Sequence, residues 1–172
     1  MGTAVTLIVG SKSPSTESNP VASKAGSPSE GPASDAPVGA EKPPKVRFGP
    51  GDMVASIPDG ASNIDLDSAP PLVAESDIKG QDLVIGATTG NPTLDTEDSE
   101  LSLAPLPSGG PAPSEAHCAE QVQKNGAYTA ELTRGARFCV QTTEGRTAFL
   151  RTVAAPTEGT VRLKVTVWDL PG

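Results

Sequence analysis

The chain has 172 residues and a formal net charge of −8; hydrophobic residues make up 35% of it, and glycine and proline together occupy 36 positions. This composition falls between that of an ordinary globular protein and that of a low-complexity chain, and it is explained most simply by one folded part and one unfolded part. So acidic a chain is also a poor ligand for a phosphate backbone, which excludes nucleic acid as a partner.

The first ten residues, MGTAVTLIVG, contain a short apolar run. This run is far shorter than the ~20 residues that span a bilayer, and it lacks the basic start of a signal peptide. Two interpretations stand side by side. Residues 1–10 are either the remnant of a membrane anchor, which would be the only link to a membrane, or an ordinary strand or incidental apolar run. Met1, Gly2 and Thr6 also fit the loose N-myristoylation pattern.

Residues 11–44 are dominated by small and turn-forming side chains. Ser, Pro, Ala and Gly make up 23 of these 34 residues, and the only larger apolar side chains are Val21 and Val38. Such a segment cannot bury enough apolar surface to offset the entropy lost on ordering its backbone. The sequence therefore predicts a disordered linker over 11–44 and a folded, β-rich domain over 45–172.

The first half of the folded region is acidic and rich in turn signals. Residues 45–110 hold 3 basic and 11 acidic side chains. Turns are expected at Gly49–Asp52 and Ile57–Gly60, and a loop at Gly109–Pro113. Alternating or continuous apolar patterns predict three strands in this half. These strands are Ser62–Asp67, Asp82–Gly86 and Glu100–Leu103.

One short helix is predicted at about 115–124. Ser114 is a suitable N-cap, and Glu115 places a negative charge at the positive end of the helix dipole. Cys118 and Val122 are four residues apart and share one face. The Asn125–Gly126 pair ends the helix.

The last third of the chain predicts three consecutive strands, which are Ala136–Thr143, Arg146–Val153 and Thr160–Trp168. The third alternates strictly, with valines and Leu163 on one face and Arg162, Lys164, Thr166 and Trp168 on the other. Strands joined by tight turns form an antiparallel meander. The predicted fold class is therefore mainly β: a small antiparallel β-sandwich or open barrel with one short helix, preceded by a disordered linker.

The two cysteines, Cys118 on the predicted helix and Cys139 on a predicted strand, form an even pair. In an exported protein such a pair indicates a disulfide. The alternative is two unpaired buried thiols that act as small hydrophobic side chains. A disulfide closing a loop of this size would add roughly 3 kcal/mol of stability.

Most catalytic constellations lack the residues that they need. His117 is the only histidine, and it is expected to be an exposed position on the helix rather than a general base. No phosphate-binding loop is present, and no cofactor is predicted. Four aspartates could ligate a cation such as Ca²⁺, although strand-edge and turn aspartates are the commoner explanation. They are Asp65, Asp67, Asp77 and Asp82, the first two expected to share one strand face.

The segments Gly135–Leu150 and Val165–Trp168, with Ile64–Ser68 and Asp82–Val84 upstream, carry a resemblance. They resemble the C-terminal, cysteine-containing β-domains of membrane-anchored actinobacterial proteins without an assigned activity. In that family a helical anchor and a Pro/Ser linker precede the domain. The resemblance implies an extracytoplasmic location, membrane-tethered or secreted, and it carries over no catalytic residue.

These observations favour a non-catalytic, extracytoplasmic binding or sensory module on a flexible stalk, with an unknown protein or cell-envelope partner. A structural cell-envelope spacer or assembly domain is the alternative. A hydrolase that uses carboxylates is a third hypothesis, which a pocket with convergent acidic groups would favour. A flat exposed apolar patch would instead favour a protein partner.

Overall fold

The computed structural model describes residues 44–57, 60–86, 91–97, 100–154 and 159–170. They belong to one compact unit, Glu41–Gly172. The predicted anchor remnant at 1–10 and, apart from Pro44, the predicted linker at 11–44 lie outside the described residues. Within the described residues, no helix is long and apolar enough to cross a bilayer.

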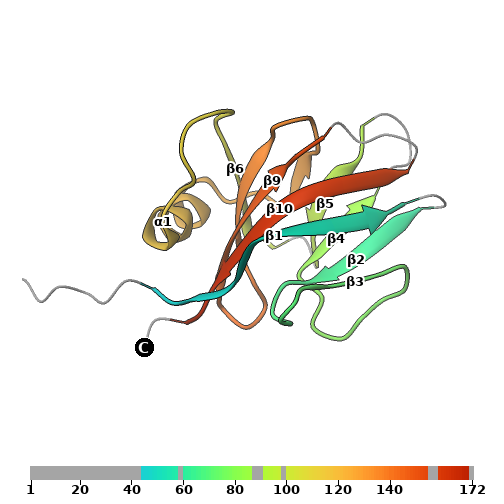
Figure 1. Cartoon of the computed structure of the whole chain (residues 1–172), viewed down its shortest axis with the longest axis horizontal. Coiled ribbons are helices and arrows are strands. Elements are labelled where there is room, and N and C mark those ends of the chain that lie inside the picture. Colours follow the sequence, from blue (N-terminus) through green and yellow to red (C-terminus); the bar gives the residue numbers. More distant parts are fainter. Residues whose placement is uncertain (1–43, 58–59, 87–90, 98–99, 155–158, 171–172) are drawn as a thin grey trace, which may run out of the picture. The chain divides into compact units, whose positions relative to one another are not determined.

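Two antiparallel five-stranded sheets make up the domain (Figure 1). Sheet A has the strand order β1-β10-β9-β8-β6, and sheet B has the order β3-β2-β4-β5-β7. The strands of sheet A are β1 (Val46–Ser56), β6 (Leu103–Leu106), β8 (Arg137–Gln141), β9 (Thr147–Thr152) and β10 (Thr160–Trp168). Those of sheet B are β2 (Ala61–Asp65), β3 (Leu72–Ala74), β4 (Leu83–Gly86), β5 (Thr93–Thr96) and β7 (Thr129–Glu131). Neither sheet closes on itself, so the fold is a β-sandwich, as predicted.

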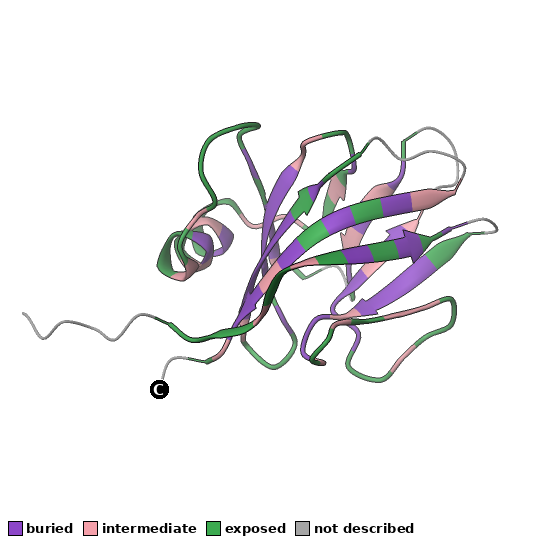
Figure 2. Ribbon diagram, in the orientation of Figure 1, coloured by how far each residue is buried: buried purple, intermediate pink, exposed green. Residues whose placement is uncertain are grey.

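The predicted C-terminal meander is confirmed. β8 pairs with β9 and β9 pairs with β10, both antiparallel. On β10, Val161, Leu163, Val165 and Val167 are all buried, while Arg162 and Lys164 are exposed (Figure 2). The period-two pattern therefore identified the core face of this strand.

The main core lies between the two sheets. Sheet A contributes side chains such as Met53, Leu150 and Leu163, and sheet B contributes Ile64 and Ile85. All are less than a tenth exposed. Burying large aliphatic side chains on both inner faces is what holds such a sandwich together, at roughly 1.5–3 kcal/mol per side chain.

The predicted turn at Gly49–Asp52 is wrong, because β1 runs through it. The pairing of β1 with β10 shifts register between Phe48 and Gly51, so the segment forms a β-bulge instead of a turn. Gly49 has φ +94°, and a Cβ there would lie 2.1 Å from the carbonyl oxygen of Val165. Turn-like residues inside a strand thus mark a bulge that only glycine can make.

The predicted helix is confirmed as α1 (Glu115–Asn125), which begins at the N-cap Ser114. The Ser114 side chain accepts a hydrogen bond from the backbone N–H of His117 at 3.2 Å. The helix contacts β8, β9 and β6, so it covers one half of the outer face of sheet A (Figure 1). The sequence did not predict the short strands β3, β5 and β7, and the strand expected at Glu100–Leu103 begins only at Leu103.

A second apolar cluster fills the space beneath α1. It contains Ala104, Leu106, Cys118, Val122, Cys139, Phe149 and Trp168. Trp168 lies on the outer side of β10, as the alternation predicted, yet it is only 7% exposed. The outer face of sheet A is therefore apolar where the helix covers it and polar where it does not.

Candidate functional site

The predicted disulfide is present. Cys118 and Cys139 are joined with an S–S distance of 2.02 Å, and both are fully buried. The bond ties α1 to β8 at the centre of the second apolar cluster. A disulfide of this kind is compatible with an oxidising, extracytoplasmic compartment.

Three of the four predicted aspartates come together, and one does not. Carboxylate oxygens of Asp65, Asp67 and Asp82 lie within 4.8 Å of one another. Asp77 is exposed and is not part of this group, which corrects the four-residue prediction. Asp65 is the last residue of β2 and Asp67 lies beyond the strand, so they do not share a strand face as expected.

Asp67 connects the end of β2 to the tight turn between β8 and β9. Its Oδ1 accepts hydrogen bonds from Thr142 Oγ1 at 2.6 Å and from Arg146 Nη1 at 2.9 Å. Its Oδ2 accepts from the backbone N–H of Glu144 at 3.0 Å. Asp67 is 7% exposed and the Arg146 side chain is 13% exposed, so this ion pair is largely withdrawn from water. We call these contacts the Asp67 clamp, because they join the two sheets through one carboxylate.

Asp65 and Asp82 complete the same network. Asp65 accepts hydrogen bonds from the backbone N–H groups of Asp67 and Ser68 and from the Ser68 hydroxyl. Asp82 accepts from Leu66 N at 2.7 Å through one oxygen and from Thr143 N at 2.6 Å through the other. Arg146 brings one positive charge to the group through Asp67, and it also pairs with Glu144. The arrangement therefore acts as a structural clamp that fixes loops of both sheets.

Burial raises the pKa of Asp82 to about 6, even though its hydrogen bonds from Thr143 and Leu66 favour the ionised form. The neighbouring charge of Asp67 adds to the increase. Asp82 is 4% exposed, so its carboxylate loses most of its hydration. A carboxyl group with this pKa changes its charge close to neutral pH.

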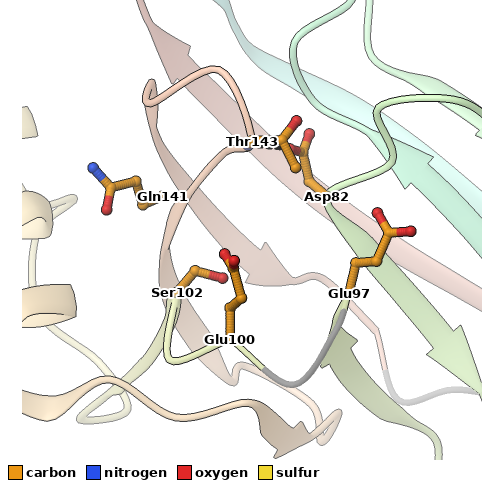
Figure 3. A pocket seen from close by; sticks show the side chains of 6 residues that line it. All are labelled: Asp82, Glu97, Glu100, Ser102, Gln141 and Thr143. Carbon is orange, nitrogen blue, oxygen red and sulfur yellow. Dashed lines mark hydrogen bonds between the residues drawn. The ribbon is translucent and has the colours of Figure 1, made fainter.

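Asp82 also lies at the wall of a small acidic cleft (Figure 3). The cleft has a volume of about 70 Å³ and is lined by Asp82, Glu97, Glu100, Ser102, Gln141 and Thr143. Pockets that enclose a drug-sized ligand have roughly 300–1,000 Å³. The described part of this cleft has room for water or a small cationic group.

His117 is exposed on α1, as predicted. Its side chain lies on a different face of the helix from the buried Cys118, because neighbouring helical residues point in different directions.

The half of the outer face of sheet A that α1 leaves open carries a row of cations. Lys164 on β10 lies directly opposite Arg151 on β9, and Arg151 lies directly opposite Arg137 on β8. Arg162 is two residues from Lys164 on the same face of β10. We call Arg151, Arg162 and Lys164 the basic face, because all three are exposed.

The basic face is only partly neutralised. Lys164 forms an exposed ion pair with Asp52 of β1 at 2.8 Å. Among the described residues, Arg151 and Arg162 form no ion pair. Arg137, at the border of the helix, is held by the backbone carbonyls of Pro107, Gly109 and Pro111 and lies 5.5 Å above the Phe149 ring. Like charges directly opposite on neighbouring strands destabilise a sheet, so this face retains a repulsion that folding alone does not require.

Sequence reasoning placed two of the three residues of the basic face together. The alternation of β10 placed Arg162 and Lys164 on one side, but it gave no register for β9. Arg151 joins them only through the pairing of Lys164 with Arg151.

Searches of protein-family models, of curated proteins and of solved structures found no match to this chain.

Proposed function

We propose that this domain is a non-catalytic, extracytoplasmic binding module whose binding surface is the basic face. The observation that carries the proposal is the cross-strand row Lys164–Arg151–Arg137, in which like charges lie directly opposite one another. Such a row costs the sheet stability, and an anionic partner would remove that cost. The chain as a whole carries a charge of −8, so a concentration of cations on one face is a local feature and no consequence of composition.

Location outside the cytoplasm is supported by the Cys118–Cys139 bond, since disulfides persist in oxidising compartments. The composition of residues 11–44 predicts a tether, and a tether suits a domain that must reach a partner. The membrane-anchored or secreted location remains part of this proposal.

Titration of the isotope-labelled chain with polyanions, followed by NMR amide shifts, tests the proposal. We expect shifts confined to the residues of β9, β10 and the adjoining part of β1. Shifts confined to the cleft around Asp82, or no shifts at low salt, would contradict the basic face as the binding surface. The variant Arg151→Gln should reduce the shifts, while Lys124→Gln on α1 should leave them unchanged.

The acidic cleft is the observation that favours the alternative hypothesis, a carboxylate-based hydrolase. A pKa of about 6 for Asp82 is in the range of a general acid. Two features weigh against this function. Both oxygens of Asp82 accept backbone N–H groups, and the cleft volume is about 70 Å³. Release of reducing sugar from a panel of polysaccharides, abolished by Asp82→Asn, would favour the hydrolase instead.

A further inference from the structure

The geometry of the basic face restricts how a partner can reach it. β10 pairs with β1 on one side and with β9 on the other, so its backbone groups are already used within the sheet. A partner therefore cannot add a strand here and must be held by side chains alone. The backbone positions that carry these cations lie roughly 5 Å apart across the strands and roughly 7 Å apart along β10. This spacing suits a chain that carries charges at short, regular intervals.

The few exposed apolar side chains on the basic face further narrow the class of partner that it can bind. Its exposed large apolar side chains among the described residues are Val54 on β1, opposite Arg162, and Val153 after β9. Insertion into a bilayer interface depends on larger apolar and aromatic side chains, so two valines are a weak anchor. Recognition of neutral sugars depends on exposed aromatic rings, and the only tryptophan is buried under α1.

Arginine supplies two of the three cations. The guanidinium group presents a planar fork of donors that matches the oxygens of a carboxylate or a phosphate group with two parallel hydrogen bonds. A polymer with phosphates in its backbone places its charge on the chain itself, so it can lie on a flat sheet without a pocket. The net charge of −8 disfavours phosphate-backbone binding over the surface as a whole, so the contact is confined to Arg151, Arg162 and Lys164, where the local charge is complementary.

We infer that the basic face binds a linear, phosphate-bearing polymer of the cell envelope. This inference rests on the proposed function and names the chemical class of its partner. Arg151 and Arg162 bind successive phosphates. Lys164 contributes a third contact, which competes with its ion pair to Asp52. The polymer lies across β10 and β9, beside the edge of α1.

Binding of the full chain to long-chain inorganic polyphosphate tests the inference, measured by calorimetry at ~50 mM and ~200 mM salt. The double variant Arg151→Gln/Arg162→Gln should weaken binding by about tenfold or more and flatten the salt dependence. The matched control, Lys79→Gln/Lys124→Gln, makes the same change in net charge away from the face. It should weaken binding less than about threefold.

Asp52→Asn provides a test in the opposite direction. Removing this carboxylate frees Lys164 and lowers the negative potential beside the face, so affinity for polyphosphate should rise several-fold. Circular dichroism and thermal unfolding of each variant establish that it is folded. Unchanged or weaker binding by this folded variant would overturn the role given to Lys164.

The outcomes separate the partner class from the proposed function. Stronger binding to poly-L-glutamate, to polygalacturonate or to vesicles containing phosphatidylglycerol, lost in the double variant, would overturn the phosphate polymer and leave the basic face as a binding surface. Equal loss of binding in the double variant and in its matched control would overturn both. Tighter binding to polyphosphate than to these other probes, lost only in the double variant, is the expected result.

Discussion

The two sheets of this domain are held to neighbouring parts of the molecule by different means. Sheet A carries α1 across part of its outer face, and an apolar cluster with a disulfide fills the space between them. The loops of sheet B contribute Asp67 and Asp82, which bind the turn between β8 and β9 through hydrogen bonds and an ion pair. Asp65 holds the loop that carries Asp67, through hydrogen bonds from Asp67 and Ser68. The comparison shows that a small domain can position one set of loops by covalent and apolar contacts and another by buried carboxylates.

The largest expected loss of stability comes from removing the carboxylate of the Asp67 clamp. Asp67→Ala removes the carboxylate that pairs with Arg146 and that accepts hydrogen bonds from Thr142 Oγ1 and the Glu144 N–H, although Arg146 keeps its ion pair with Glu144. Losing these three contacts of a buried carboxylate costs about 4 kcal/mol, since a hydrogen bond to a charged group contributes about 1.5–3 kcal/mol. Urea unfolding should show this loss, while Asp77→Ala, at an exposed position, should change stability by less than about 0.5 kcal/mol. If Asp67→Ala loses as little stability as the control, the Asp67 clamp does not stabilise the fold.

The disulfide between Cys118 and Cys139 should contribute somewhat less to stability than the Asp67 clamp does. Cys118→Ala/Cys139→Ala should lower the free energy of unfolding by about 3 kcal/mol, because the unfolded chain regains the freedom of the closed loop. The same loss should appear in the unmodified protein after reduction. Thermal unfolding with and without reductant measures both. If reductant leaves the midpoint of the unmodified protein unchanged, the bond does not stabilise the fold.

The raised pKa of Asp82 predicts a pH dependence specific to the polar network. Its pKa is about 6 in the folded state and near its ordinary value of 3.8 in the unfolded state. Between these values the folded state binds more protons, so this group makes stability increase as pH falls from about 6 to about 4, by about 2 kcal/mol. The contribution is lost as pH rises through 6. Unfolding series across this pH range for the natural chain and Asp82→Asn should differ by this amount, and parallel curves would refute it.

The smallest expected effect on stability comes from the exposed cations on the part of sheet A that α1 does not cover. Arg151→Thr removes a cation that faces Lys164 and Arg137, and threonine suits a strand. Stability should therefore rise by about 0.5 kcal/mol, and added salt should stabilise the natural chain more than the variant. Lys124→Gln removes a cation from α1, where it pairs with Glu120, and should lower stability by a few tenths of a kcal/mol. A loss of stability in Arg151→Thr would show that the row is not repulsive.

Local patterns predicted some parts of this molecule and not others, for physical reasons. Thr160–Trp168 was identified as a strand because strict alternation reports burial on one face. Gly49–Asp52 was misassigned because glycine and proline mark both turns and bulges, and only pairing with β10 distinguishes the two. β3 and β7 have three residues each, too few for a period to show.

The candidate sites divide in the same way. The disulfide could be predicted from two cysteines, because the pairing had no alternative within the chain. Asp65 and Asp67 are close in sequence, but their meeting with Asp82, and the hydrogen bonds to Thr143 and Arg146, depend on how the two sheets pack. The basic face likewise depends on strand register, which no local pattern of β9 specifies.

The adjacency of the first and last strands has a consequence for how the domain can be carried. Val46 pairs with Trp168, and the Asp169 N–H donates a hydrogen bond to the carbonyl of Lys45. Lys45 Nζ and Asp169 Oδ2 form an ion pair at 3.3 Å. The polypeptide thus enters and leaves the sandwich at one point (Figure 1). Such a unit can be spliced into a surface loop of a host protein with little closure cost. A pulling force applied between those ends would load the β1–β10 hydrogen bonds one after another, like a zipper, and would open this edge before the disulfide-bonded part of the sheet.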